Sequence, residues 1–144
     1  MSDIKLTGID VSGTFVGEWN DFSFTGTQDL EIVEGADYTK QKVTKILLTP
    51  MGSNTNFPGY GTRLQSAIHG DLDNTLVQGQ IVDAILNAIT YLETLETSTN
   101  PAERITAIED VDVLASAAQT AIFVDLTLRL STNEILEIIL GDRL

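Results

Sequence analysis

Carboxylates are the residues of this chain that could do chemistry, because they are numerous and some stand close together. The chain of 144 residues has 21 Asp and Glu against 8 Lys and Arg, a net charge of −13. Glu103 with Asp110 or Asp112 could form the pair of carboxyl groups, about 5 to 9 Å apart, that glycoside hydrolysis requires. Such pairs arise by chance among so many acids, and no sequence feature places one in an apolar pocket that would raise its pKa. We therefore predict that the chain is not an enzyme.

Other signatures of catalysis and of cofactor or metal binding are absent. There is no Gly-x-Ser-x-Gly, His-Glu-x-x-His, dinucleotide fingerprint or calcium loop. The chain has no cysteine, which excludes disulfides, thiolate zinc sites and cysteine nucleophiles. The single histidine, His69, is more typical of a helix end than of a metal ligand or general base, because a metal site usually needs several such residues. We predict no cofactor and no metal.

The charge and length of the chain restrict the class of partner. A net charge of −13 repels phosphate backbones and anionic lipid, so the predicted partners are proteins, with no nucleic acid and no membrane. The first 13 residues contain no apolar run that would serve as a signal peptide or anchor. We expect a soluble chain, made in the cytoplasm, with one core of its own.

Hydrophobic spacing predicts three helices in the middle of the chain. The first covers residues 37–48, and its Lys40, Lys42 and Lys45 are expected on a solvated face or, alternatively, against an acidic neighbour. A glycine-rich loop follows, in which the glycines beside Tyr60 indicate a turn that lets the backbone pass close to a neighbouring element. A short helix at residues 62–68, capped by Thr62, leads to a long amphipathic helix that begins at Asp71 or Asp73 and ends near residue 97.

The last third of the chain changes to the period of a β-strand. Apolar residues alternate with polar ones over residues 122–130, and a short connection leads to a β-prone run at residues 134–140, which predicts an antiparallel hairpin. Residues 104–113 add a further strand, and residues 114–120 are the expected loop. The predicted fold class is α+β: a small antiparallel or mixed sheet, with a C-terminal hairpin, packed on the long helix and accompanied by two shorter helices.

Residues 1–35 are predicted to form an extended N-terminal arm, which leaves residues 36–144 as the main domain. This segment is rich in glycine and contains Phe15, Trp19, Phe22 and Phe24, and its short alternating runs favour strands and turns. Two interpretations remain open. The aromatic residues pack under the sheet of their own domain, or Trp19 and Phe22 anchor a neighbouring subunit.

The segment from Pro101 to Ile105 places a charged pair, Glu103 and Arg104, between the long helix and a strand. One interpretation is an exposed turn with a local ion pair worth about 0 to 1 kcal/mol. The other is an arginine presented from a rigid corner for bidentate pairing with a carboxylate of a partner.

The order of these signals resembles the baseplate wedge family of contractile phage tails, also called gpW or lysozyme-like wedge proteins. The similarity extends over about residues 28–140, and each motif is loose when taken singly. The collinear motifs are Leu47-Leu48-Thr49, Gly52, Tyr60-Gly61, Leu64, the apolar stripe of residues 81–95, Arg104-Ile105 and Val111-Asp112-Val113. The family has Glu-Pro-Arg where this chain has Ala102-Glu103-Arg104, so only Arg104 carries over position for position.

The resemblance implies a structural protein of the virion tail baseplate, assembled in the host cytoplasm. Its implied partners are the larger baseplate wedge proteins, docked at Glu103 and Arg104, and the tail sheath protein, with several copies in a sixfold baseplate. Sheath assembly would begin when extended arms of sheath subunits add to an exposed sheet edge. The alternatives are a peptidoglycan-degrading tail lysozyme, or the equivalent subunit of a secretion system or tailocin.

The predicted hairpin is the candidate for that exposed edge, because an unprotected edge strand is otherwise an aggregation hazard. We expect residues 134–140 at or next to the edge, with Ile135, Ile138 and Leu140 as partner-binding residues. Deletion of residues 135–144 is then expected to preserve wedge binding and abolish sheath assembly.

Overall fold

The computed structural model describes residues 2–4, 6–9, 14–22, 32–64, 75–95, 100–115 and 121–143. Of residues 2–22 only the course of the backbone is described. The elements, in chain order, are β1 (Ser2–Ile4), β2 (Leu6–Ile9), β3 (Thr14–Phe22), β4 (Ile32–Glu34), α1 (Gly35–Leu48), α3 (Thr75–Leu95), the 3-10 turn η1 (Pro101–Glu103), β5 (Ile105–Ala115), β6 (Ala121–Leu130) and β7 (Ile135–Arg143).

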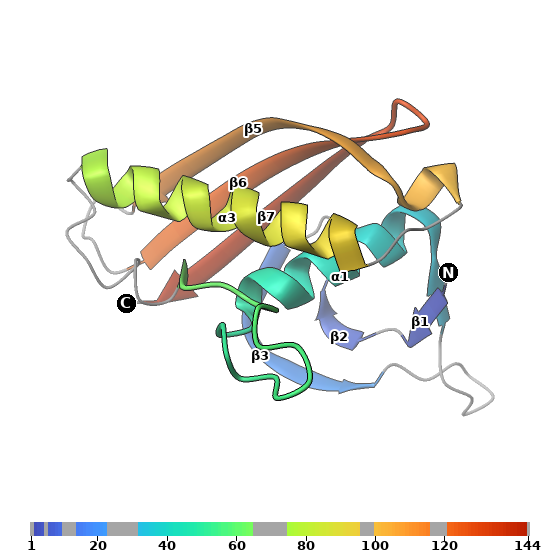
Figure 1. Cartoon of the computed structure of the whole chain (residues 1–144), viewed down its shortest axis with the longest axis horizontal. Helices are drawn as coiled ribbons and strands as arrows, with labels where there is room; N and C mark the ends of the chain where they lie inside the picture. The colour runs from blue at the N-terminus through green and yellow to red at the C-terminus, as the bar shows by residue number, and fades with distance from the viewer. Residues whose placement is uncertain are drawn as a thin grey trace.

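A mixed sheet is the centre of the fold, and it confirms the predicted α+β class (Figure 1). Its strand order is β2-β3-β7-β6-β5. β5, β6 and β7 form an antiparallel meander, and β6 and β7 form the predicted hairpin. β3 joins the other side of β7 in parallel, and β1 pairs separately with β4.

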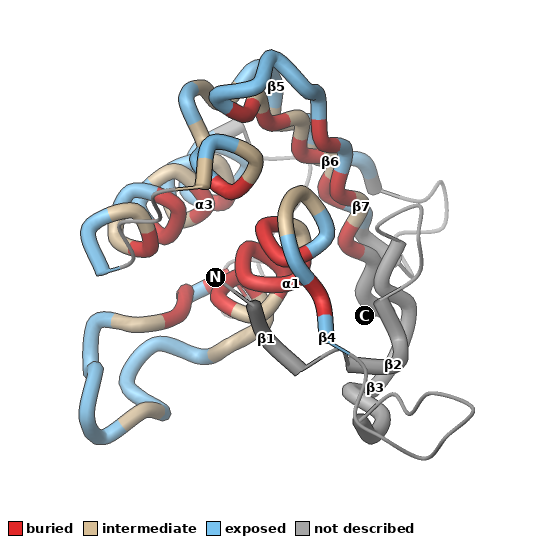
Figure 2. The backbone as a smooth tube through the Cα atoms, turned by 90° about the vertical axis from the view of Figure 1, so that its right-hand side faces the viewer, coloured by how far each residue is buried: buried red, intermediate tan, exposed pale blue. Residues whose placement is uncertain are grey.

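The core lies between the sheet and the helices, which cover one face of the β5, β6 and β7 strands (Figure 2). In β6, Val124, Leu126, Leu128 and Leu130 are all buried, while the residues between them face the other way, as the period of two predicts. The α3 stripe, including Ile81, Ile85 and Leu92, packs onto this surface as predicted. Each fully buried aliphatic side chain contributes about 1.5 to 3 kcal/mol of burial free energy, so this layer carries most of the stability.

Helix α1 begins two residues before the predicted start, at Gly35, and buries Val43, Ile46 and Leu47 as its spacing indicates. The prediction of a solvated face is wrong for Lys42, whose side chain is buried. Its Nζ atom lies 3.7 Å from a carboxylate oxygen of Glu93 in α3 and 5.6 Å from the centre of the Tyr38 ring. A buried ammonium group needs such partners, because its desolvation is otherwise costly.

The predicted boundaries of other elements differ in detail. β5 continues to Ala115, so Leu114 and Ala115 belong to a strand and not to the expected loop, and β7 continues past residue 140 to Arg143. The predicted short helix lies outside the described residues after Leu64, whose amide donates to Thr62 Oγ1 as a cap predicts. The ends of the predicted long helix, residues 71–74 and 96–97, also lie outside the described part. No helix of that part is long and apolar enough to cross a membrane.

The N-terminal segment is tied to the rest of the chain by strand pairing. Thr14, Phe15 and Val16 of β3 pair with Ile139, Leu140 and Gly141 of β7, and β2 continues the sheet beyond β3. The strands predicted for this segment are therefore present. Its role in holding a neighbouring subunit stays a prediction.

The loop after α1 returns to the helix end and is held there by backbone hydrogen bonds. The amide of Thr62 donates to the carbonyl of Thr49 (2.8 Å), and the amide of Met51 donates to the carbonyl of Thr62 (2.9 Å). Gly61 makes this approach possible, since it has a φ of +112° and a Cβ atom there would lie 2.4 Å from the Thr49 carbonyl oxygen. This confirms the close backbone passage predicted beside Tyr60.

Replacement of Gly61 by alanine should therefore destabilise the protein more than the same change at Gly52. Gly52 also has a positive φ, of +86°, but nothing lies within 4 Å of the added Cβ. We expect Gly52→Ala to cost about 1 kcal/mol and Gly61→Ala about 3 kcal/mol or more, measured by urea unfolding. Equal losses in the two variants would show that the approach to Thr49 is not the constraint.

Candidate functional site

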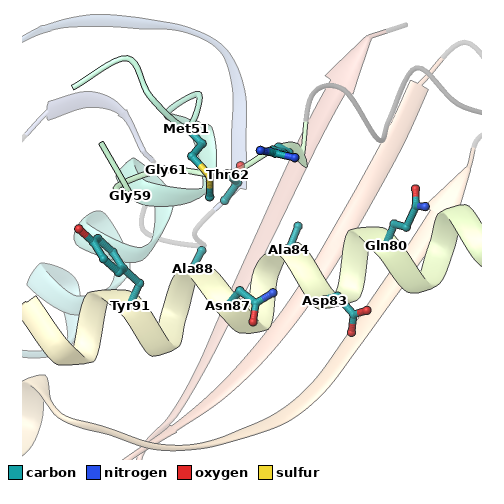
Figure 3. Close-up of a pocket in the computed structure, with 11 residues that line it drawn as sticks. Met51, Gly59, Gly61, Thr62, Gln80, Asp83, Ala84, Asn87, Ala88 and Tyr91 are labelled. Carbon is teal, nitrogen blue, oxygen red and sulfur yellow. The ribbon is translucent and has the colours of Figure 1, made fainter. Parts of the chain in front are cut away.

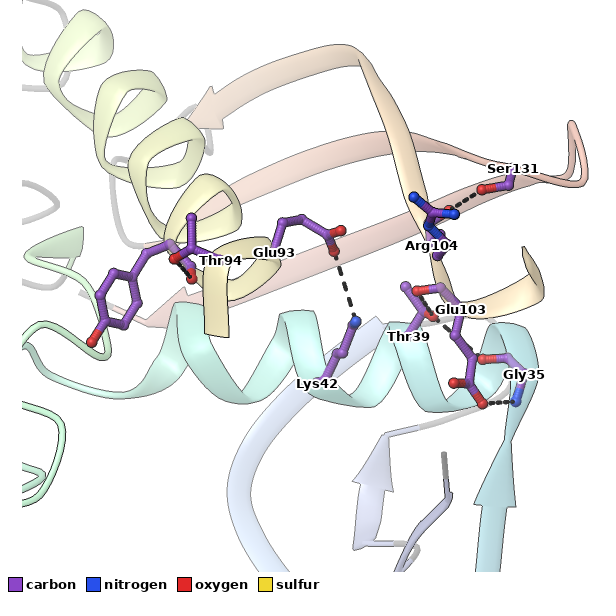
Figure 4. A network of polar contacts seen from close by, with 9 residues as sticks. Gly35, Thr39, Lys42, Glu93, Thr94, Glu103, Arg104 and Ser131 are labelled. Carbon is purple, nitrogen blue, oxygen red and sulfur yellow. Dashed lines mark hydrogen bonds and ion pairs between the residues drawn. The ribbon is translucent and has the colours of Figure 1, made fainter. Parts of the chain in front are cut away.

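The corner between η1 and α1 is organised around a buried carboxylate. Glu103 is fully buried, and its Oε1 atom accepts a hydrogen bond from the Gly35 amide (3.2 Å) (Figure 4). The same atom also accepts from the Asn100 side-chain amide (3.3 Å). Its carbonyl oxygen accepts a third, from the Thr39 hydroxyl (3.1 Å). Gly35 begins α1, where unpaired amides and the helix dipole favour a negative charge.

The Glu103 carboxylate is buried and accepts its hydrogen bonds within its own chain. It is therefore not available for the predicted contact with a partner. A sequence alone does not show that this acid lies beside the first turn of a helix 68 residues earlier. The local ion pair with Arg104, the first interpretation of this segment, is also absent among the interactions of the described residues. The carboxylate fixes the corner and presents no surface.

Arg104 is the exposed member of this corner. Its backbone is held in place, because its amide donates to the Pro101 carbonyl and its carbonyl accepts from the Ser131 amide (2.9 Å). The guanidinium group makes no hydrogen bond or ion pair with any residue that the structure describes. The structure therefore places an exposed arginine on a rigid support, the arrangement that bidentate pairing with an external carboxylate uses.

A groove lies between the loop after α1 and the exposed side of α3 (Figure 3). Its volume is about 660 Å³, and its lining includes Met51, Arg63, Asp83, Asn87 and Tyr91. Asp83 is the one carboxylate in the described lining. A hydrolase of the two-carboxylate type needs a second acid beside the substrate, and the groove as described does not provide one.

The carboxylates that the sequence suggests as a possible catalytic pair do not share a cleft. Glu103 is buried at the corner, whereas Asp110 and Asp112 are exposed on β5, and none of the three lines the groove. The described residues also contain no group of three or more acidic, histidine or cysteine side chains arranged to hold a metal ion.

The second charged feature is the outer sheet face, which we define as the side of β5, β6 and β7 that faces away from the helices. Four of its carboxylates, Asp110, Asp112, Asp125 and Glu137, form what we call the acidic patch. Asp112 is paired directly with Asp125 across β5 and β6. Burial raises the pKa of Asp125. The negative charge of Glu137, a hydrogen bond with the Glu137 side chain and the negative charges of Asp112 and Asp110 raise this pKa further.

The predicted hairpin contacts need two corrections. Ile138 and Leu140 are buried in the core, so their side chains offer nothing to a partner, and only Ile135 is exposed. β7 is also not an edge strand, because it lies between β6 and β3. Deletion of residues 135–144 would remove a central strand and cannot separate sheath assembly from folding. Trp19 and Phe22 lie in β3, but their side chains are outside the described part, and their role stays a prediction.

Comparison with known proteins adds one finding. No protein-family model and no curated protein matches the chain. Among solved structures, the "putative tail lysozyme" of Geobacter sulfurreducens matches with a TM-score of 0.60 and 21% identity, over 75% of this chain and 89% of that one. The chain shares the fold of that protein. At this identity the likeness concerns the fold alone, and membership of the baseplate wedge family stays a prediction.

Removal of the Glu103 carboxylate should destabilise the fold. Glu103→Ala leaves the Gly35 and Asn100 donors without their acceptor in a buried place, which we expect to cost about 1 to 3 kcal/mol in urea unfolding. Glu134→Ala, at an exposed position, is the control and should change stability by less than about 0.5 kcal/mol. A neutral result for Glu103→Ala would remove the carboxylate from its structural role.

Asp125→Asn should stabilise the protein in a pH-dependent way. The folded pKa is raised above the ordinary value of 3.8, so the ionised form is disfavoured in the folded state, and this cost appears as the pH rises above 3.8. We expect a higher thermal midpoint than wild type at neutral pH and a difference that disappears below pH 3.8. Asp83→Asn, which removes an exposed acid of α3, is the control for the loss of one negative charge. A stabilisation that persists at low pH would contradict this explanation.

Proposed function

We propose that this chain is a structural subunit of a contractile-tail baseplate, which docks on larger wedge proteins and starts sheath assembly. The observation that carries the proposal is the fold shared with a protein named as a tail lysozyme. The order of motifs in the sequence supports the same assignment. The equivalent subunit of a secretion system or tailocin would use the same surfaces.

In this proposal, Arg104 is the docking residue for the wedge proteins. It is exposed, its backbone is held by hydrogen bonds to Pro101 and Ser131, and the buried Glu103 next to it ties the corner to α1. Because the backbone of Arg104 is already held, only its side chain must be ordered when it pairs with a carboxylate, so less conformational entropy is lost than for an arginine on a mobile loop.

The proposed acceptor of sheath strands is β5, in place of the hairpin strand β7. β5 is an edge strand with β6 as its only neighbour among the described strands. Its pairing with β6 is irregular between Ile105 and Asp110 but regular from there to Ala115. Irregular pairing hinders the addition of another strand, whereas a regular edge presents backbone groups in the correct spacing. Within this stretch the Val111 amide donates to Asp110 Oδ1 (3.0 Å), a contact that an added strand would replace. We therefore assign strand addition to the second half of β5.

The competing function is a peptidoglycan hydrolase. The carboxylate pair suggested by the sequence is Glu103 with Asp110 or Asp112. Glu103 is buried and hydrogen-bonded within its own chain, which argues against this pair as a catalytic one. A hydrolase would lose activity when one Asp or Glu becomes an amide, whereas a structural subunit would lose assembly on changes at its contact surfaces.

Co-purification with the wedge and sheath proteins encoded beside this chain tests the proposal. Arg104→Ala should weaken wedge binding at least about tenfold and leave sheath binding intact, while Arg63→Ala, another exposed arginine, should change neither. Hydrogen exchange of the sheath complex should show new protection of amides between Asp110 and Ala115. Wild-type protein that binds neither partner but cleaves peptidoglycan would replace this proposal with the enzymatic one.

A further inference from the structure

The outer sheet face has a definite arrangement of side chains that the proposed wedge and sheath contacts do not use. The register across β5, β6 and β7 places Leu114 beside Phe123, then Asp112 beside Asp125 and Ile139, then Asp110 beside Thr127 and Glu137. Successive rows lie about 7 Å apart and neighbouring strands about 5 Å apart. The acidic patch is therefore a compact group drawn from three strands.

Negative charge dominates this face. Its described side chains comprise five carboxylates, those of Glu109 and the acidic patch, and one cation, Arg129. Arg129 is already committed, because its Nε atom lies 2.5 Å from an oxygen of Glu109. The four acids of the patch consequently face one another without a cation of the described chain among them.

One member of the patch also has an unsatisfied atom. The Oδ1 atom of Asp125 is enclosed and has no hydrogen-bond partner. An enclosed carboxylate oxygen without a donor is costly, and three like charges around it add to the cost. Positive charge from an external group above the patch would offset the repulsion among these acids.

Apolar side chains flank the acidic patch. Leu114 is 55% exposed and stands directly opposite Phe123, which is 38% exposed, at one end of the face. Ile135, beside Arg129, is 49% exposed at the other end. Large apolar side chains that gather on an uncovered sheet face, next to charged residues, are typical of a surface that another protein covers.

We infer that the outer sheet face docks a basic protein surface, with lysine or arginine side chains among Asp110, Asp112, Asp125 and Glu137 and an apolar contact over Leu114 and Phe123. Charge complementarity selects this occupant. A second copy of this chain, with a net charge of −13, and a nucleic acid are both repelled. The inference does not depend on the tail function, because it concerns side chains of the sheet face and neither Arg104 nor the backbone edge of β5.

The test uses a synthetic peptide in which lysine alternates with threonine and which ends in two leucines, titrated into the isotope-labelled full chain. An extended peptide of this pattern presents its lysines on one side at the row spacing of the patch. We expect saturable binding, weakened by salt, with NMR shift changes concentrated at the acidic patch and at Leu114 and Phe123. Absence of saturation at about millimolar peptide, or shifts spread over other acidic surfaces, would overturn the inference.

Two variants with the same net charge separate this surface from general attraction to an acidic protein. Asp110→Asn, Asp112→Asn and Glu137→Gln together should weaken binding at least about tenfold. Glu34→Gln, Asp37→Asn and Asp83→Asn, also exposed acids, should together change it by less than about twofold. Equal effects in the two triple variants would refute a specific surface. Circular dichroism verifies that both variants are folded, and Leu114→Ser tests the apolar contact separately.

Discussion

The alternation of side chains in β6 and β7 is the constraint on which the rest of the structure depends. One set of residues in these strands, from Val124 to Leu140, is buried under α1 and α3, so the other set must point outward. A shift of one residue in either strand would exchange the two faces and place acids in the core. Packing of the helices and exposure of the acidic patch both follow from this register.

The corner between η1 and α1 shows how a polar core residue joins distant segments. Glu103 joins the connection after α3 to the first turns of α1, because it accepts hydrogen bonds from Gly35, Thr39 and Asn100. Lys42 does the same between α1 and α3 through Glu93. Such groups contribute little net stability when satisfied, but they define how the elements meet because any other arrangement leaves them unpaired.

The elements that were predictable from the sequence are those with a local signal. Such signals are the period of two in β6, the apolar stripe of α3 and the turn at Gly61. Each depends on residues that are close together in the sequence, and all three predictions are confirmed. The burial of Lys42 and Glu103 was not predictable, because the partners of these residues come from distant segments. The acidic patch is also hidden in the sequence, where its acids look like separate solvated residues, since three strands in a particular register bring them together. The same reason explains why the sequence predicts residues 134–140 at or next to an edge, whereas β7 lies inside the sheet: its second neighbour, β3, comes from the opposite end of the chain.

That parallel pairing of β3 with β7 has a consequence for how the protein is made. Residues 14–16 pair with residues 139–141, so the paired residues are separated by most of the sequence. During translation β3 emerges from the ribosome well before its partner strand β7. Contacts of such high sequence separation form slowly because a long loop must close first. One edge of β3 therefore keeps unpaired backbone groups until β7 has been synthesised, and such an edge is prone to pair with another chain during folding.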